Sequence, residues 1–387
     1  MTHWTEDQKR LRADLDHWYE AFSADHIRAD REGVFPWDRW KLVRESGILG
    51  LPFEQRWGGL GRDLLTTMYV LEGLGYGCRD GGLNFSITTQ LVSVGIPLQR
   101  FGSSELKDRH LPRVCDGSAI CAHAITERAG GSDALNMRTR ATRDGQHFVL
   151  TGSKAFVTNG PVADLFMVYA RTQGDGGPLG ITALLVERDT PGLTIGPPVD
   201  KMGLRTSPLC ELFFDDCRVP VSNTVGRLGA GFFILDQVMK WEILCSFIVN
   251  AGEMQHRLER CVDYAKTRVQ FGQPLGSFQA IANKIVDMEI GVATARKWLY
   301  DTARRYADDE NVTIDVAISK LLASEGNVAS AMAAMQIFGG NGYMAEHGLE
   351  KDLRNAVAGT IYSGTSEIQR NRIAAMLGLR QPGAIRQ

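Results

Sequence analysis

The spacing of apolar residues changes twice along this chain of 387 residues, and few folds accommodate both changes. Up to about residue 115 apolar side chains recur at the spacing of an amphipathic helix. Short β-like runs then alternate with glycine, aspartate and proline, and helical spacing returns afterwards. The sequence predicts an α+β multidomain chain with an N-terminal helical domain (1–115), a middle antiparallel β domain (116–224) and a C-terminal four-helix bundle (225–387).

Local signals refine this order of elements. Thr5 and Gln8 fit a capping box at the start of the first helix. A second helical region, 64–111, is interrupted at Pro97. The expected strands are His147–Leu150, Leu165–Ala170, Thr182–Val186 and Leu212–Phe214. The expected later helices are Phe232–Val249, Met254–Arg268, Phe278–Tyr306 and Ile314–Phe338, the last stopped by the glycines of 339–342.

Composition excludes several classes of protein. A formal net charge of −2 gives no field that would attract nucleic acid. The N-terminal segment is charged, and no apolar run reaches the roughly 18 residues of a membrane span, so neither a signal peptide nor a membrane association is expected. The seven cysteines are scattered without a Cys-x-x-Cys pair, which predicts reduced thiols in the cytoplasm and neither disulfides nor a zinc site.

Two glycine-rich segments have the composition of phosphate-binding loops. Gly226–Gly231 matches a dinucleotide fingerprint poorly, because its glycine spacing is wrong and no βαβ unit surrounds it. Thr126–Asp133 combines glycines with flanking hydroxyls, so its backbone amides can cradle a pyrophosphate. A β-turn explains the same residues equally well, and both interpretations stay open.

Glu242 is the most informative single residue. Between Lys240 and Glu253 it is the one charge in an otherwise apolar stretch of helix. The helical face that carries it consists of Leu235, Met239, Glu242, Ser246 and Val249. Burial disfavours the ionised form of a carboxylate, which brings its proton affinity toward that of a general base working near neutral pH. A core glutamate bonded to a neighbouring basic residue is the alternative interpretation.

Other polar features are less specific. The turn Tyr362–Gln369 opens a helix, so its amides can hold a phosphate, or Thr365 or Ser366 simply caps the helix. His110 and His123 are interpreted as structural residues. No cluster of histidine, aspartate and glutamate has the spacing of a metal site, so none is expected.

Taken together, these pieces resemble the acyl-CoA dehydrogenase family across essentially the whole chain. The matching segments occur in the family's order, and their number makes the resemblance specific. They are Ile125–Glu127 with Gly131–Asp133, Gly152–Lys154 with Thr158–Gly160, Phe213–Pro220, Arg268–Gly272, Gln336–Tyr343 and Gly364–Ser366. The resemblance implies the acyl-CoA dehydrogenase fold, noncovalently bound FAD and a homotetramer of paired subunits.

The resemblance also assigns cofactor-binding residues. Those implied to contact flavin or pyrophosphate in the same subunit are Ile125, Thr126, Ser132, Phe156 and Thr158. Those implied to reach the FAD of a neighbouring subunit are Arg268, Phe271, Gln279, Gln336 and Gly340, with Thr365 and Glu367 at its ADP portion. Phe156 stands where many members have tryptophan, which is a tolerable exchange of aromatic rings.

The catalytic base departs from the majority pattern. Most members carry a glutamate immediately before Gly-Thr-Ser, and here that position is Ser363, which cannot serve as a base. A minority, similar to isovaleryl-CoA dehydrogenase, place the base on the first long helix of the C-terminal domain. Counting back from Arg268 and Phe271, that position is Glu242. The resemblance and the argument from burial therefore name the same residue.

The substrate positions depart as well. Members that bind CoA usually have aspartate two residues before this base and arginine one after, and here these are Lys240 and Ile243. With Tyr362 and Ser363, they are the positions expected to line the substrate. Together with the Trp241-Glu242 pair, this pattern resembles dehydrogenases that oxidise prolyl or acyl groups tethered to carrier proteins.

The resemblance implies FAD-dependent α,β-dehydrogenation of an acyl or aminoacyl thioester. Glu242 would take the α-hydrogen as a proton, the β-hydrogen would leave as a hydride to flavin N5, and the backbone amide of Ser363 would bond the thioester oxygen. A flavoprotein or oxygen would then accept the electrons. Three alternatives stay open: a dehydrogenase of short or branched CoA thioesters, a flavin acyl oxidase or nitroalkane-type oxidase, and a catalytically silent flavoprotein scaffold.

Overall fold

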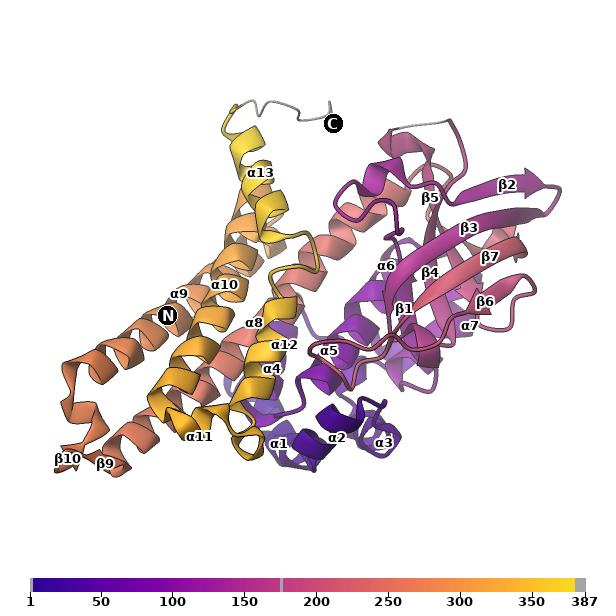
Figure 1. The fold of residues 1–387 in the computed structure, drawn as a ribbon. Helices are drawn as coiled ribbons and strands as arrows, with labels where there is room; N and C mark the ends of the chain where they lie inside the picture. Colours follow the sequence, from indigo (N-terminus) through magenta and orange to yellow (C-terminus); the bar gives the residue numbers. More distant parts are fainter. Residues whose placement is uncertain (1–2, 175–176, 380–387) are drawn as a thin grey trace.

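The computed structural model describes residues 3–174 and 177–379 and follows the predicted order of helices, strands and helices (Figure 1). The N-terminal helices are α1 (Glu6–Phe22), α2 (His26–Glu32), α3 (Trp37–Ser46), α4 (Leu64–Gly77), α5 (Gly81–Thr89), α6 (Ile96–Phe101) and α7 (Ser104–Cys115). The strands of the middle region are β1 (Cys121–Ala124), β2 (Arg140–Asp144), β3 (His147–Thr158), β4 (Leu165–Arg171), β5 (Ile181–Glu187), β6 (Leu193–Ile195), β7 (Leu209–Pro220) and β8 (Thr224–Val225).

The C-terminal part is helical again. Its elements are α8 (Gly231–Thr267), β9 (Val269–Gln270), β10 (Gln273–Pro274), α9 (Gln279–Ala307), α10 (Thr313–Phe338), α11 (Gly340–Tyr343), α12 (Leu349–Ala358) and α13 (Ser366–Met376). The predicted domain limit after residue 115 falls between α7 and β1, whereas the limit after residue 224 cuts β8. The outer ends of the predicted domains, residues 1 and 387, lie outside the described residues.

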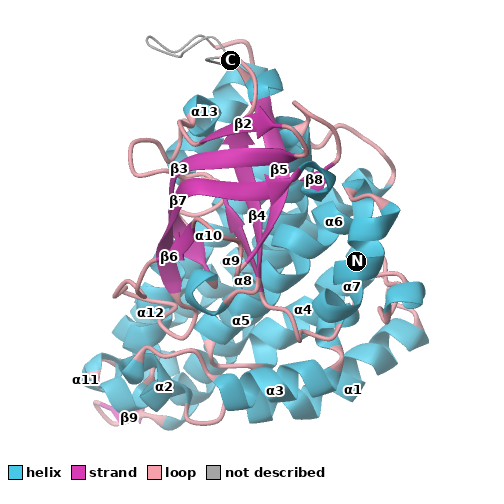
Figure 2. Cartoon of the chain, turned by 90° about the vertical axis from the view of Figure 1, so that its right-hand side faces the viewer, coloured by secondary structure: helices cyan, strands magenta, loops and turns pink. Residues whose placement is uncertain are grey.

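The middle region forms one sheet with the strand order β6-β7-β3-β2-β4-β5-β8 (Figure 2). Most neighbouring strands pair antiparallel, as expected for a region without long helices. The prediction of a purely antiparallel sheet needs one correction, because β1 and β2 both pair with β4 in parallel. The chain reaches these pairings by crossing over rather than by tight hairpins, and short β-like runs do not reveal such crossovers.

Helix α8 is one continuous helix, where the sequence predicted two helices with a break near Asn250. The cause is close packing against α4. A Cβ on Gly252 would lie 2.2 Å from the carbonyl oxygen of Glu72, and one on Gly75 would lie 2.0 Å from that of Val249. The glycines therefore let the two backbones approach closely. The residues around Gly252, where the sequence predicted a helix end, form the contact between α8 and α4 instead.

The other predicted helix break also differs. Pro97 stands in the first turn of α6 and directly follows a π-helical segment, Gln90–Gly95, that joins α5 to α6, so regular α-helical bonding changes just before it while the chain stays helical. The chain leaves helical geometry instead at Cys78, between α4 and α5, and at Gly102, between α6 and α7. The capping box predicted for the first helix is present, with the Thr5 and Gln8 side chains and backbone amides bonding reciprocally.

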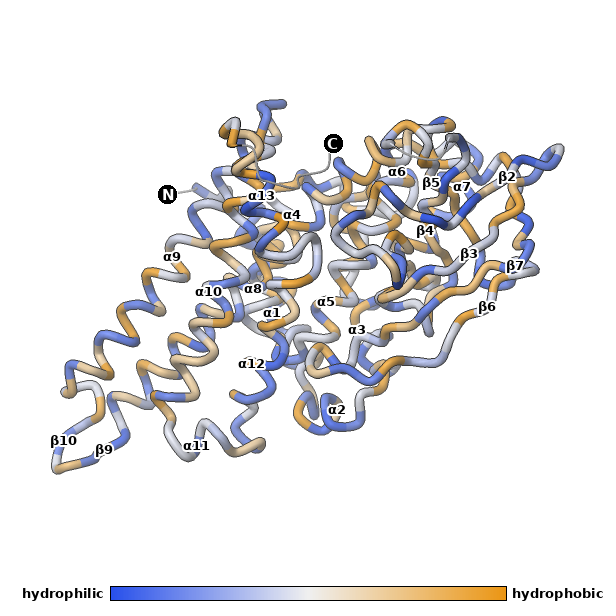
Figure 3. The backbone as a smooth tube through the Cα atoms, turned by 45° about the horizontal axis from the view of Figure 1, so that its top comes forward, coloured by the Kyte–Doolittle hydropathy of each residue, from blue (hydrophilic) through white to orange (hydrophobic). Residues whose placement is uncertain are grey.

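The hydrophobic core is divided. A large cluster runs from the N-terminal helices through the sheet to the first half of α8, and a smaller one joins the second half of α8 to α9 and α10. The bundle then extends to the β9–β10 hairpin at its far end (Figure 3). Its outer helix α9 leaves Val286 and Ile290 more than half exposed. No helix of the described part is long and apolar enough to cross a membrane.

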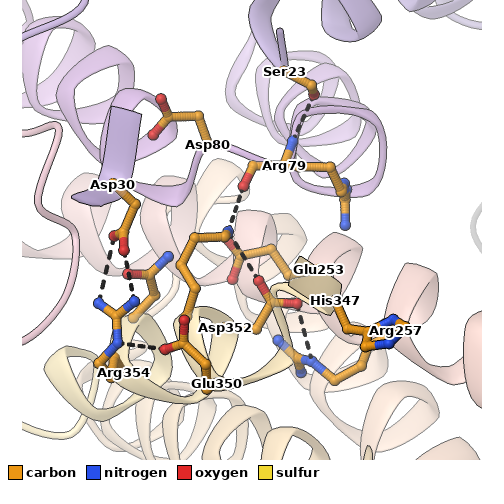
Figure 4. Close-up of polar contacts among 12 residues, drawn as sticks. Ser23, Asp30, Arg79, Asp80, Glu253, Arg257, His347, Glu350, Asp352 and Arg354 are labelled. Carbon is orange, nitrogen blue, oxygen red and sulfur yellow. Dashed lines mark hydrogen bonds and ion pairs between the residues drawn. The ribbon is translucent and has the colours of Figure 1, made fainter. Parts of the chain in front are cut away.

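A buried polar cluster joins the N-terminal helices to α12 (Figure 4). Arg354 bonds Asp30 at 2.6 Å and Glu350 at 2.7 Å. Lys351 donates to the backbone oxygen of Arg79 at 2.8 Å and to Asp352 at 3.1 Å. Breaking one of these pairs would leave a buried charge without a partner. The cluster therefore fixes α12, and with it the following turn at Ser363, against the N-terminal helices.

Candidate active site

The carboxylate of Glu242 lies at the junction of α8, β1 and the turn before α13. The residue is 8% exposed, as the apolar face of its helix predicts. Its Oε1 accepts a hydrogen bond of 2.5 Å from the hydroxyl of Ser363. Its Oε2 is buried and has no hydrogen-bond partner among the described residues. No lysine or arginine of the described part forms an ion pair with it, which argues against a purely structural glutamate.

Ser363 reaches Glu242 because the turn that carries it is unusual. Its φ is +54°, a left-handed conformation that non-glycine residues adopt infrequently, and Gly364 follows at φ +86°. The amide of Gln369 donates to the carbonyl oxygen of Ser363 at 2.9 Å and fixes the turn. The hydroxyl of Thr365 accepts from the backbone N–H of Ile368, so the N-cap predicted for this helix is present.

His123 is the residue that sequence reasoning missed. It was interpreted as structural, yet its Nε2 lies 3.6 Å from Oε2 of Glu242. The sequence carries no local signal for this contact, because the two residues belong to different elements. The position of His123 as the one half-buried residue of the otherwise buried strand β1 becomes visible only once the strand is paired.

A buried ion pair anchors the loop after β1 to β3. Lys154 Nζ lies 3.0 Å from Oε1 of Glu127, and their side chains are 0% and 9% exposed. Burial lowers the pKa of Lys154 to about 8, against the opposing charge of Glu127. Burial alone would raise the pKa of Glu127, but Lys154 and hydrogen bonds from Thr139 and Arg138 outweigh it and hold that pKa below its usual value. The pair links the motif Ile125–Glu127 to the motif Gly152–Lys154, which explains why the two occur together.

The structure brings the first group of predicted cofactor residues together. The backbone N–H of Ala155 donates to the carbonyl oxygen of Thr126 at 2.8 Å, which places the loop beside the end of β3. Ile125 and Thr126 precede this anchor on one side, and Phe156 and Thr158 follow it on the other. Ser132 is exposed in the same loop.

These residues fit the FAD that the resemblance implies. Phe156 presents an aromatic ring that is 66% exposed, at φ +56°, and such a ring suits contact with a planar ligand. Threonine and serine hydroxyls beside it supply donors, and Gly131 leaves the loop backbone accessible, with nothing closer than 3.9 Å to a Cβ placed there. A flat apolar surface next to hydroxyls and free amides matches an isoalloxazine ring joined to a pyrophosphate.

The second group lies elsewhere in the protomer. All five residues are exposed: Arg268 caps the end of α8, Phe271 lies between β9 and β10, Gln279 begins α9, Gln336 lies in the last turn of α10 and Gly340 begins α11. The hairpin β9–β10 and these element ends lie at the far end of the bundle (Figure 1). Arg268 lies about 39 Å from Glu242 along α8, at about 1.5 Å per residue. Phe271 is 94% exposed. Within one protomer these residues do not meet the loop at Ser132.

Thr365 and Glu367 form a third location, at the start of α13. The backbone N–H of Glu367 and the hydroxyl of Thr365 lower the pKa of the Glu367 carboxyl. The two residues are close to Ser363 in sequence and belong to the helix that packs against α10.

Lys240 and Ile243 face away from the carboxylate of Glu242. Ile243 is fully buried in the core, and Lys240 forms an ion pair of 2.6 Å with Asp236 one turn earlier on α8. Lys240 also borders a groove of about 380 Å³ with Arg100 and Tyr306. Their predicted contact with substrate stays a prediction, since helical geometry turns both side chains away from Glu242.

Tyr362 closes the space beneath the base. Its ring packs against Phe85 and Phe247, with centroids 4.7 and 5.2 Å away. A cavity of about 20 Å³ continues between α5 and α8, bordered by Tyr362, Ser246 and Glu253. That volume holds about one water molecule and no long acyl chain. Among the described residues no group of histidine, cysteine, aspartate and glutamate could hold a metal ion.

Comparison with known proteins agrees with this geometry. The chain matches the acyl-CoA dehydrogenase N-terminal domain over residues 5–118, the middle domain over 122–217 and the C-terminal domain over 229–378. An L-prolyl-[peptidyl-carrier protein] dehydrogenase of a Serratia strain is 40% identical, over 88% of each chain.

Solved structures of similar proteins include further acyl-CoA dehydrogenase relatives. The prolyl acyl carrier protein oxidase AnaB has a TM-score of 0.95 and 39% identity, over 97% of this chain and 100% of its own. Butyryl-CoA dehydrogenase of Megasphaera elsdenii has a TM-score of 0.93 and 32% identity, over 97% and 99%. With its three domains matched in order and its relatives aligned over most of both chains, this chain belongs to the acyl-CoA dehydrogenase family.

Proposed function

We propose that this chain is an FAD-dependent dehydrogenase that introduces an α,β double bond into a small aminoacyl thioester tethered to a carrier protein. The observation that carries this proposal is the buried carboxylate of Glu242, with one oxygen held by Ser363 and the other without a partner. The prolyl carrier-protein dehydrogenase and oxidase among the relatives support the substrate class.

Glu242 is the proposed base. The thioester carbonyl acidifies the α-hydrogen, and Glu242 removes it as a proton while Ser363 holds the carboxylate from the opposite oxygen. The backbone N–H of Ser363 is the proposed donor to the thioester oxygen, where negative charge develops in the transition state. The left-handed backbone at Ser363 turns this amide away from regular helix bonding.

When bound, FAD would supply the acceptor for the β-hydrogen, which leaves as a hydride. The residues proposed to hold it within the protomer are Ile125, Thr126, Ser132, Phe156 and Thr158. The buried pair of Lys154 and Glu127 holds their two segments together. Contact of Phe156 with the flavin explains an exposed aromatic ring that would otherwise face water.

The narrow space near Glu242 favours a small acyl group. Tyr362, Phe85 and Phe247 fill the region that a long chain would need, and the cavity beyond them ends at polar side chains such as Asn250 and Glu253. Because so little room continues beyond Tyr362, a short aminoacyl group is favoured over a fatty acyl chain.

The test is anaerobic flavin bleaching by a panel of thioesters. Prolyl, butyryl and isovaleryl groups would each be presented on CoA and on a phosphopantetheinylated carrier protein. We expect fast bleaching with prolyl-carrier protein and at least a ten-fold slower rate with the matched CoA thioesters. Faster bleaching by butyryl-CoA or isovaleryl-CoA would instead identify a short-chain or branched-chain CoA dehydrogenase, and a protein that binds no flavin would be a silent scaffold.

An oxidase is the second candidate function, favoured by the similarity to the oxidase AnaB. The two functions differ in what reoxidises the reduced flavin. After anaerobic bleaching, admission of air restores the yellow colour within seconds for an oxidase, whereas a dehydrogenase needs an electron-accepting flavoprotein. Hydrogen peroxide formed per substrate consumed gives the same distinction at steady state.

We also propose that the chain works as a homotetramer in which Arg268, Phe271, Gln279, Gln336 and Gly340 reach the FAD of a neighbour, with Thr365 and Glu367 at its ADP portion. Exposed apolar side chains around the hairpin and on α9 support this, including Phe271, Tyr343, Val286 and Ile290. Sedimentation should give four protomers, and Phe271→Ser should lower FAD retention. A monomer that retains FAD would contradict the assembly. The seven free, buried thiols support a reducing compartment such as the cytoplasm.

A further inference from the structure

The carboxylate of Glu242 has a second polar neighbour, the imidazole of His123. His123 Nε2 lies 3.6 Å from Glu242 Oε2, and the two side chains are 18% and 10% exposed. Glu242 Oε2 and His123 Nδ1 are both buried and lack hydrogen-bond partners among the described residues. An unsatisfied carboxylate oxygen therefore lies opposite the imidazole Nε2 at the proposed base.

We propose that His123 is a positioning residue for this base, with its Nε2–H donating to Oε2 of Glu242 while the hydroxyl of Ser363 donates to Oε1. The inference rests on the proposed function, because it takes Glu242 to be the group that receives the α-proton. Held at both oxygens, the carboxylate cannot rotate about its last torsion, and its remaining lone pairs keep a fixed direction toward the substrate.

The tautomer follows from what each ring nitrogen faces. A hydrogen on Nε2 points at a carboxylate oxygen that has no other partner. A hydrogen on Nδ1 would be buried without an acceptor and would leave that oxygen unsatisfied, which costs free energy twice. The Nε2–H form is therefore favoured. The 3.6 Å separation is slightly longer than a hydrogen bond, and catalytic hydrogen bonds commonly tighten when substrate excludes water.

The other groups around Glu242 do not replace this donor. Tyr169 on β4 has a buried hydroxyl without a partner, and burial together with the charge of Glu242 raises its pKa. Burial, followed by the charges of Glu253 and Glu242, raises the pKa of Tyr362 likewise. Both phenols stay neutral, and neither forms a hydrogen bond with Glu242.

Two substitutions of His123 distinguish the effect of losing the N–H donor from the effect of losing the imidazole ring. His123→Leu removes both nitrogens at similar volume, and His123→Gln keeps an N–H near the place of Nε2. At equal flavin content and melting temperature, we expect His123→Leu to slow the limiting rate of bleaching by prolyl-carrier protein about 10- to 100-fold, with the half-saturating concentration unchanged within about two-fold. His123→Gln should recover most of that rate. A normal rate in His123→Leu, or a Gln variant as slow as the Leu variant, would overturn the proposal.

The coupling to Glu242 is tested in two further ways. In a Glu242→Gln background, His123→Leu should slow the residual rate no further, because the two residues act as one unit. In protein labelled with ¹³C at histidine Cε1, the resonance that His123→Leu removes should move in Glu242→Gln, and an unmoved resonance would refute the contact. Because this second readout needs no substrate, a shift in a protein that no thioester bleaches would reject the proposed function while the contact stands.

Discussion

The hydroxyl of Ser363 donates a 2.5 Å hydrogen bond to Oε1 of Glu242, across 121 residues of chain. By the family resemblance, this bond joins residue 363, where the majority base is expected, to Glu242, where the minority base is expected. A glutamate at residue 363 would put two carboxylates against each other, and like charges at that distance disfavour ionisation of both. Serine instead supplies a donor to Oε1, so the proposed base at Glu242 has one oxygen bonded while Oε2 has no partner among the described residues.

Replacement of Glu242 by Gln should abolish most of the chemistry while sparing the cofactor. Glutamine keeps the shape and can still accept from Ser363, but it cannot take a proton. Loss of a positioned general base costs about 10²- to 10⁴-fold in rate. The variant should purify yellow and bleach that much more slowly with substrate in anaerobic stopped-flow.

The matched control for this experiment is Ser363→Ala. It removes the side-chain donor but retains the backbone amide proposed to bond the thioester oxygen, so its rate should fall less, by about the 10- to 100-fold expected for loss of one donor to the carboxylate. A nearly normal rate in Glu242→Gln together with a large loss in Ser363→Ala would place the base at the turn instead.

Lys154→Met should destabilise the protein and weaken flavin binding together. The substitution leaves Glu127 buried beside an apolar chain, and breaking a buried ion pair from one side costs about 3–5 kcal/mol. The loop that carries Thr126 and Ser132 then loses its side-chain anchor on β3 and keeps only the backbone bond from Ala155. Thermal melting and the flavin content after dialysis measure the two effects.

The control for Lys154→Met is Arg128→Met, on the same loop. Arg128 pairs with Glu211, but its side chain is 80% exposed. An exposed pair contributes little to stability, so melting and flavin content should change little. Equal losses in both variants would show that the loop itself, rather than the buried pair, determines stability.

The order of helices and strands could be predicted because apolar periodicity is a local property of the chain. Glu242 could be found for the same reason, as a single charge in an apolar helix. The continuity of α8 could not, because it depends on Gly75 and Gly252 meeting across two helices that are distant in sequence. A glycine that ends a helix and one that admits a neighbouring backbone look alike in sequence.

The contact of His123 with Glu242 lay beyond sequence reasoning for a related cause. It requires β1 to pair with β4 and the edge of the sheet to approach α8, and neither event leaves a trace in the residues around His123. The resemblance to the family did not supply it either, because the matching motif begins at Ile125. The parallel pairing of β1 was missed on the same grounds, since short runs reveal strands but not their partners.

His256→Gln should flatten the loss of stability in acid. Burial, with the nearby charges of Arg79 and Arg260, lowers the pKa of His256 from 6.5 to about 3. The unfolded chain therefore binds a proton below about pH 6.5 that the folded chain refuses, and the free energy of unfolding falls as pH drops from 6.5 toward 3. Between pH 6.5 and 5.5 this contributes at most about 1 kcal/mol, and less because the ring is only half-buried.

Urea unfolding at pH 7.5, 6.5 and 5.5 measures this dependence. The glutamine variant should lose less stability than the wild type across the interval, and the exposed His17→Gln should behave like the wild type. A wild-type protein and His256→Gln with parallel pH dependence would show that His256 is not buried as a neutral ring.

Tyr362 should limit the size of the acyl group. Its ring fills the space between Phe85 and Phe247, one residue before Ser363, and only about 20 Å³ remains beyond it. Tyr362→Phe keeps the packed ring and should leave the preference for short groups unchanged. Tyr362→Ala opens the space at a cost of about 3–5 kcal/mol in stability, so it is compared at a temperature where melting shows it folded.

Tyr362→Ala should raise the relative rate of longer acyl groups only. Each methylene newly buried contributes about 0.8 kcal/mol, or about four-fold in relative rate, so pentanoyl-carrier protein should gain on butyryl-carrier protein by about that factor. The gain should stop after a few methylenes, because Asn250 and Glu253 border the far end of the cavity and an apolar tail would strip them of water. Competition between the two thioesters in one reaction measures the ratio directly. An unchanged ratio in Tyr362→Ala would mean that the acyl group leaves the base in another direction, away from α5 and the buried polar end of α8.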